Sequence, residues 1–191
     1  MTNTPLPAWA ALESDADFTD PAAICAQAAL FDRRIARRNR IERLAGLVQL
    51  PFWGALAGFF FWEGEALIGV SLLMIVGGIM LVMRNLSLFA GNLAPQPEQP
   101  CRMHLEAQYR RQLHALRRVP VWYIGPVVPG VFAFFAATAA GAARNVGWAA
   151  AVEGAAMPFA ITFGIFAVVI LLNRRAARAV ADDLERIQHE A

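Results

Sequence analysis

The sequence predicts an all-α integral membrane protein: four transmembrane helices in two hairpins, with further amphipathic helices on the cytoplasmic side. The first observation behind this prediction is a set of four apolar blocks that contain no Asp, Glu, Arg, Lys or His. These blocks are residues 44–62, 66–83, 119–143 and 154–173. A helix rises about 1.5 Å per residue, so about 20 apolar residues cross a hydrocarbon core of about 30 Å. With 58% hydrophobic residues and a mean hydropathy of +0.44, the chain is too apolar for an ordinary soluble domain.

The second observation is the distribution of arginine. All 17 basic residues are Arg, and only Arg144 lies outside residues 1–43, 84–118 and 174–191. Short connections rich in Arg stay in the cytoplasm. We therefore expect a multi-pass protein of the bacterial inner membrane, with both termini and the central connection cytoplasmic.

The N-terminal part divides into a tail and a helix. Residues 1–20 read as a flexible acidic tail without the basic and apolar regions of a signal peptide. Thr19 or Asp20 is a suitable N-cap, and Pro21 suits the first turn, so residues 21–43 form a cytoplasmic helix. One apolar stripe predicts that this helix is amphipathic: Ile24, Ala28, Phe31 and Ile35.

Residues 44–83 form the first transmembrane hairpin, in which Glu63, Gly64 and Glu65 leave room only for a tight turn. Gly54 and Gly58 have the spacing of a helix-packing motif. Within one bundle, such a motif serves internal contacts more often than dimerisation.

Residues 84–118 combine a proline-containing linker with a second amphipathic helix that begins near Cys101. Its stripe consists of Leu105, Tyr109, Leu113 and Leu116. On the same helix, Glu106 and Arg110 form a favourable i,i+4 pair.

Residues 119–173 form the second transmembrane hairpin, with an outer loop at residues 142–153. Prolines remove backbone donors and clash with the preceding turn, so we expect a kinked or broken span near its start. The residues concerned are Gly125, Pro126, Pro129 and Gly130. Residues 174–191 form a C-terminal cytoplasmic helix with the stripe Ala177, Val180, Leu184 and Ile187, which we expect to dock on the other cytoplasmic helices.

The segment from Cys101 to Gly130, with Trp122 and Tyr123 followed by the spacing Pro126-x-x-Pro129-Gly130, resembles a group of uncharacterised small bacterial inner-membrane proteins. Members of that group carry an Arg-rich helix before each pair of spans. The resemblance implies the architecture only, because the group brings no activity with it.

The spans contain no charged residue, and no catalytic signature occurs anywhere in the chain. We therefore expect a non-enzymatic, membrane-anchored regulatory or scaffolding protein without a cofactor. The alternative is a small transporter or channel that uses the proline-broken third span. Its weakness is the lack of the intramembrane carboxylates that coupled transporters generally use.

Ten arginines flank the spans and are the expected contacts with lipid headgroups or a protein partner. They are Arg33, Arg34, Arg37, Arg38, Arg110, Arg111, Arg117, Arg118, Arg174 and Arg175. Their juxtamembrane position favours membrane lipids over nucleic acid, and it leaves a cytoplasmic protein partner or a homo-oligomer open.

The cysteines and histidines do not form a convincing metal site. Cys101 and His104 have the spacing of two zinc ligands and His114 is near, but no second pair completes four ligands. Because Cys25 and Cys101 both lie in segments assigned to the cytoplasm, we expect reduced thiols and no disulfide. Asp182 and Arg186 are expected to form a solvated i,i+4 pair.

Overall fold

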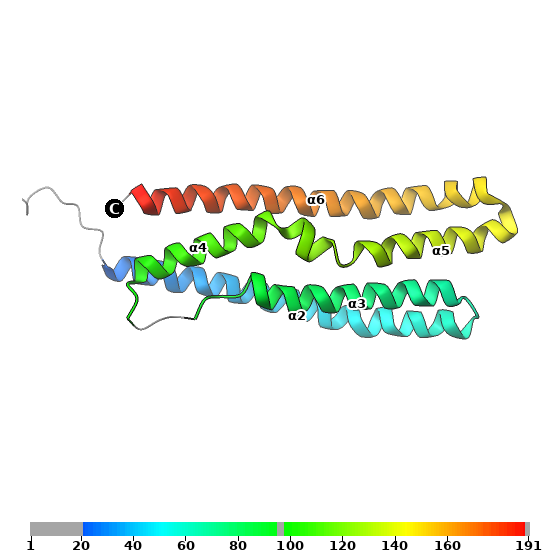
Figure 1. Ribbon diagram of the computed structural model, residues 1–191, viewed down its shortest axis with the longest axis horizontal. Coiled ribbons are helices and arrows are strands. Elements are labelled where there is room, and N and C mark those ends of the chain that lie inside the picture. The colour runs from blue at the N-terminus through cyan, green and yellow to red at the C-terminus, as the bar shows by residue number, and fades with distance from the viewer. Residues whose placement is uncertain (1–20, 95–97, 190–191) are drawn as a thin grey trace, which may run out of the picture.

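The computed structural model describes residues 21–94 and 98–189, and in that part of the chain every regular element is a helix. The predicted acidic tail at residues 1–20 lies outside the described residues. The elements in chain order are α2 (Pro21–Trp62), α3 (Ala66–Phe89), α4 (Cys101–Arg117), the π-helical turn η1 (Pro120–Ile124), α5 (Val128–Val146) and α6 (Trp148–His189). Figure 1 shows α2 and α3 as one hairpin and α5 and α6 as another, with α4 preceding η1 beside α2.

Three helices are long and apolar enough to cross a membrane: α2, α3 and α6. Their apolar surfaces are not all used for packing. Val48 is 71% exposed and Met157 is 72% exposed, and many Leu, Ile and Phe side chains of these helices also face outward. Such a belt of exposed apolar side chains would be unfavourable in water and fits a lipid environment.

The third expected span is not one continuous helix. Residues 119–143 form η1, a turn at residues 125–127 and the first part of α5, which continues to Val146. Pro126 and Pro129 interrupt the backbone ladder here, as expected from their missing N–H groups. The structure therefore supports three candidate spans and a broken fourth segment.

The connection between α5 and α6 is much shorter than expected. Residues 142–153 were expected to form an outer loop, but α5 runs to Val146 and α6 begins at Trp148. Gly147, with φ of 80°, makes the reversal alone. Glycine reaches this left-handed conformation without a Cβ clash, so one residue can replace a loop.

Three clusters of buried residues follow one another along the bundle. The first lies between α2, α3 and α5 and includes Leu72 and Ile75. The second joins the end of α3 to α4 and η1, with Leu86 and Trp122. The third lies at the end of the bundle where α2 begins and α6 ends, between α2, α4 and α6.

We call this end the arginine-rich layer and define it as residues 21–43 of α2, all of α4 and residues 174–189 of α6. Its core contains Ala28, Leu105, Tyr109 and Leu184, with Val180 and Ile187 packed against it. The aromatic rings of Phe31 and Tyr109 stack with their centroids 4.2 Å apart. The expected docking of the C-terminal stripe is thus confirmed for α4, and Leu184 shares this core with Ala28 of α2. Burial, together with the nearby Asp183 carboxylate, raises the pKa of Tyr109.

Two expectations for this layer are wrong. Cys25 and Cys101 are joined by a disulfide, with their Cα atoms 5.1 Å apart, because α2 and α4 begin side by side. The expectation of free thiols considered only the compartment of the two cysteines and not their distance from each other in the fold. Arg186 pairs with Asp183 at 3.3 Å in an i,i+3 arrangement, in place of the expected i,i+4 pair with Asp182. The expected pair of Glu106 and Arg110 is present at 2.6 Å.

Candidate functional site

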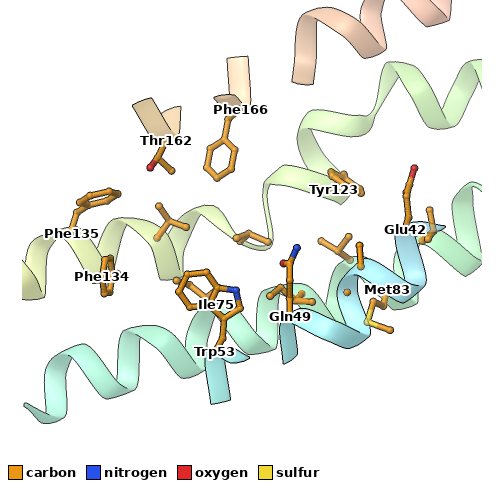
Figure 2. Close-up of a pocket in the computed structure, with 17 residues that line it drawn as sticks. Glu42, Gln49, Trp53, Ile75, Met83, Tyr123, Phe134, Phe135, Thr162 and Phe166 are labelled. Atoms are coloured by element: carbon orange, nitrogen blue, oxygen red, sulfur yellow. The ribbon is translucent and has the colours of Figure 1, made fainter. Parts of the chain in front are cut away.

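A cavity of about 420 Å³ lies between the two hairpins (Figure 2). Helix α2 packs against α3 and α4, whereas α6 packs against α4 and α5. The space between α2 and α6 is therefore not closed by an extensive helix contact. The volume is in the range of small-molecule pockets in proteins.

Two glycines set the position of the broken segment against α3. A Cβ atom added at Gly78 would lie 2.5 Å from the Pro126 carbonyl oxygen, and one at Gly130 would lie 2.7 Å from the backbone nitrogen of Ile75. The backbones of α3 and of the broken segment consequently approach more closely than side chains would allow. This contact directs Val127, Val131 and Phe134 toward the cavity.

The expected broken-span residues are thus collected at one place. Gly125 follows η1, and its backbone N–H donates to the Pro120 carbonyl oxygen at 3.0 Å. Pro126 lies within the turn, and Pro129 lies at the second residue of α5, next to Gly130. Asn85 of α3 donates from its side chain to the Trp122 carbonyl oxygen at 3.0 Å, which ties η1 to α3.

The cavity wall is mainly aliphatic and aromatic, with few polar groups. Helix α2 contributes Glu42, Gln49 and Trp53, and Figure 2 shows Gln49 and Trp53 extending from α2 toward α5. Glu42 is the one charged side chain in the lining, and its carboxylate lies 3.5 Å from Arg38 Nε. Tyr123 and Thr162 add hydroxyl groups from η1 and α6.

A second, smaller cavity continues from the first toward the arginine-rich layer. It shares Glu42 and Tyr123 with the first cavity, and adds Arg38, Trp122 and Asn173. The apolar space therefore ends in a polar mouth that carries one cationic and one anionic side chain.

The ten predicted arginine contacts separate into two groups. Eight side chains are exposed on the arginine-rich layer or at its membrane edge: Arg33, Arg34, Arg37, Arg110, Arg117, Arg118, Arg174 and Arg175. The other two are partly buried and serve the fold. Arg38 donates to Gln112 at 3.2 Å, and Arg111 donates to the Leu88 carbonyl oxygen at 2.8 Å.

The expected packing glycines lie away from every close helix contact that the structure describes. Cβ atoms at Gly54 and Gly58 would meet no atom within 4 Å. Inside this bundle the motif makes no close contact, so a packing role in another association stays a prediction.

Sequence reasoning missed a network of buried amides at the end of α3. Asn39 Nδ2 donates to the Ala90 carbonyl oxygen at 2.7 Å, and Gln112 Nε2 donates to the same oxygen at 3.2 Å. Gln108 binds the backbone N–H of Leu93 and the side chain of Asn92. The available signal was that Asn39 continues the apolar stripe of α2 one turn beyond Ile35, where a solvated amide would not be expected.

The residues considered as metal ligands have other contacts. The Cys101 sulfur is bonded to Cys25, and His104 Nε2 lies 3.1 Å from Asp32 Oδ2. His114 is exposed on α4. Among the described residues, no group of three or more His, Cys, Asp or Glu side chains is placed to hold a metal ion.

No family model, curated protein sequence or solved structure matches this chain.

Proposed function

We propose that this chain is a non-enzymatic regulatory or scaffolding protein of the bacterial inner membrane, in which the membrane helices hold the arginine-rich layer in the cytoplasm. The observation that carries the proposal is the packing of the layer. Its apolar stripes meet one another inside, so its outer surface presents arginines on a folded support. A surface of this kind suits recognition of anionic groups.

The proposed protein crosses the membrane four times. Helices α2, α3 and α6 cross the membrane, and η1 with α5 crosses as the broken fourth segment. The turns at residues 63–65 and at Gly147 would then face the periplasm, where Arg144 pairs with Glu65 at 3.2 Å. Both termini would be cytoplasmic, in agreement with the arginine distribution.

The arginines lie at two distances from the predicted spans, and each distance favours a different role. Arg117, Arg118, Arg174 and Arg175 lie within about two residues of the predicted spans, at the level of lipid headgroups. Arg33 and Arg34 precede residue 44 by at least 10 residues, or about 15 Å along the helix. Headgroups extend only about 5–7 Å beyond each side of the hydrocarbon core. The distal arginines are therefore available to an acidic protein partner.

Photo-crosslinking in cells tests the partner role. A crosslinking amino acid at Ala29, one turn before Arg33, should give discrete protein adducts. Changing Arg33, Arg34 and Arg37 to Gln should remove these adducts, whereas changing Arg174, Arg175 and Arg178 to Gln should leave them in place. Adducts that persist in the first triple variant, or only lipid adducts at Ala29, would contradict the partner role.

The competing function is a small transporter or channel. The observation that favours it is the broken segment beside the cavity, because irregular backbone inside membranes is found where it is covered by protein or lines a cavity. Solute or ion flux into proteoliposomes that contain the purified chain, compared with empty liposomes, separates the two functions. Flux that disappears when Gly130→Leu displaces the broken segment would favour transport over scaffolding.

A further inference from the structure

The cavity between the two hairpins contains polar groups that the packing of the protein does not satisfy. Neither the Gln49 amide nor the Trp53 indole N–H forms a hydrogen bond with any residue that the structure describes, although both line the cavity. Both lie inside the predicted first span. Unpaired polar groups are costly in an apolar environment, so a ligand with hydrogen-bond acceptors at this depth would stabilise them.

These groups form a series along one face of α2. Gln49 follows Glu42 by two helical turns, about 10 Å, and Trp53 follows Gln49 by one turn, about 6 Å. Glu42 lies at the polar mouth with Arg38, only two residues before the start of the predicted span. The series therefore runs from charged groups at the membrane interface to neutral hydrogen-bonding groups inside.

The deep part of the cavity is apolar. Ile75 of α3, Phe134 and Phe135 of α5, and Phe166 of α6 line it (Figure 2). These side chains offer hydrocarbon and aromatic surface to an acyl chain.

The cavity also has a route to lipid. α2 and α6 have no extensive contact with each other, and the lining residues Ala45 and Gln49 on α2 are exposed. In a membrane, this side of the bundle faces hydrocarbon chains. A lipid molecule can thus enter sideways without leaving the bilayer.

We propose that this cavity is a specific binding site for a zwitterionic glycerophospholipid with an ammonium headgroup. The ammonium group binds Glu42, and the phosphate binds Arg38, which lies 3.5 Å from Glu42. The ester carbonyl oxygens accept hydrogen bonds from Gln49 and Trp53. One acyl chain lies among the phenylalanines. The opposite charges of Arg38 and Glu42 match a zwitterionic headgroup, whereas a lipid with only a phosphate charge leaves the Glu42 carboxylate beside another anion.

Native mass spectrometry of the purified full-length chain tests this site. The chain is extracted in mild detergent from membranes that contain both phosphatidylethanolamine and phosphatidylglycerol, and the retained lipid is identified. We expect retained phosphatidylethanolamine. Glu42→Gln, which removes the charge at nearly constant size, should lower its retention about tenfold, as expected for a lost charge-assisted contact. Glu63→Gln, in the turn that follows α2 and outside the cavity lining, is the matched control and should have no effect.

A second pair of variants tests the cavity without touching the charges. Ala45→Phe fills the space and should abolish retention, whereas Val48→Phe, on an exposed position of α2 outside the cavity lining, should not. Circular dichroism of each variant shows whether the helices remain folded. Equal retention of both lipids by the unchanged chain, or undiminished retention in folded Ala45→Phe, would overturn the proposal. This site does not depend on the proposed partner role, and either can fail alone.

Discussion

At the residue scale, the structure depends on polar side chains that satisfy the C-terminal end of α3. The last carbonyl groups of a helix have no partner within the helix. Here the Ala90 carbonyl oxygen, in a residue with no exposed surface, accepts from Asn39 of α2 and Gln112 of α4. Because both partners lie far away in the sequence, the stripes and caps of α3 could not indicate them. The unusual burial of Gln108 and Gln112 becomes understandable only when this helix end is next to α4.

Removing these donors should weaken the bundle in a recognisable pattern. Asn39→Ala should lower the free energy of unfolding by about 1 kcal/mol, and Gln112→Ala by a similar amount, because one donor to the Ala90 carbonyl remains in each variant. The double variant leaves the carbonyl unpaired and should cost more than the sum of the single changes. Unfolding by SDS titration in mixed micelles measures these differences.

Asn145→Ala is the control, because Asn145 is exposed and forms no side-chain hydrogen bond within the described residues. Its effect should stay within about 0.5 kcal/mol. Strict additivity of the Asn39 and Gln112 changes would contradict a shared acceptor.

At the scale of elements, sequence patterns predicted the amphipathic helices and the tight turn at residues 63–65 well, but not the connections on either side of α5. The apolar stripes of α2 and α4 both point into the core of the arginine-rich layer, as 3.6-residue periodicity indicates. The π-helical turn η1 could not be located in advance. The broken segment that follows η1 is held against α3 by close backbone approaches at Gly78 and Gly130, which are tertiary contacts. Likewise, the reversal at Gly147 depends on the positions of both flanking helices.

The C-terminal part of α6 should be ordered only because it is docked. An isolated helix of this length is marginal in water, so its stability comes from the packing of Leu184 and Ile187 in the core of the arginine-rich layer. Each buried side chain of this kind contributes roughly 1.5–3 kcal/mol. Changing Leu184 and Ile187 to Asp should therefore free the segment while the membrane helices stay inserted.

Hydrogen exchange of residues 177–188 measures directly whether this segment is ordered. Exchange should be slow in the unchanged chain and at least tenfold faster in the double variant. Ala179→Asp, at an exposed position of the same helix, should leave exchange nearly unchanged. Fast exchange in the unchanged chain would show that the contact is absent in solution.

At the scale of the whole molecule, local signals are insufficient for two features. The cavity results from the way the hairpins are spread apart, which the four apolar blocks do not specify. The side of the membrane is the second feature. The arginines predict a cytoplasmic layer. A Cys25–Cys101 disulfide is typical of an oxidising compartment. The two signals agree only if the bond forms on oxidation of a cytoplasmic pair of thiols that the fold already holds together.

We predict that Cys25 and Cys101 lie on the cytoplasmic side of the membrane and are joined there by the disulfide that the structure shows. A membrane-impermeant maleimide should then label neither cysteine in intact cells, with or without dithiothreitol. In lysates it should label both cysteines only after dithiothreitol.

Asn145→Cys, in a chain with Cys25→Ser and Cys101→Ser, serves as the control and should be labelled in intact cells, since it lies near the turn at Gly147. Labelling of the native cysteines in fresh lysates without dithiothreitol would contradict the bond. Labelling of both native cysteines in intact cells after dithiothreitol, together with failure to label Asn145→Cys, would place the arginine-rich layer outside.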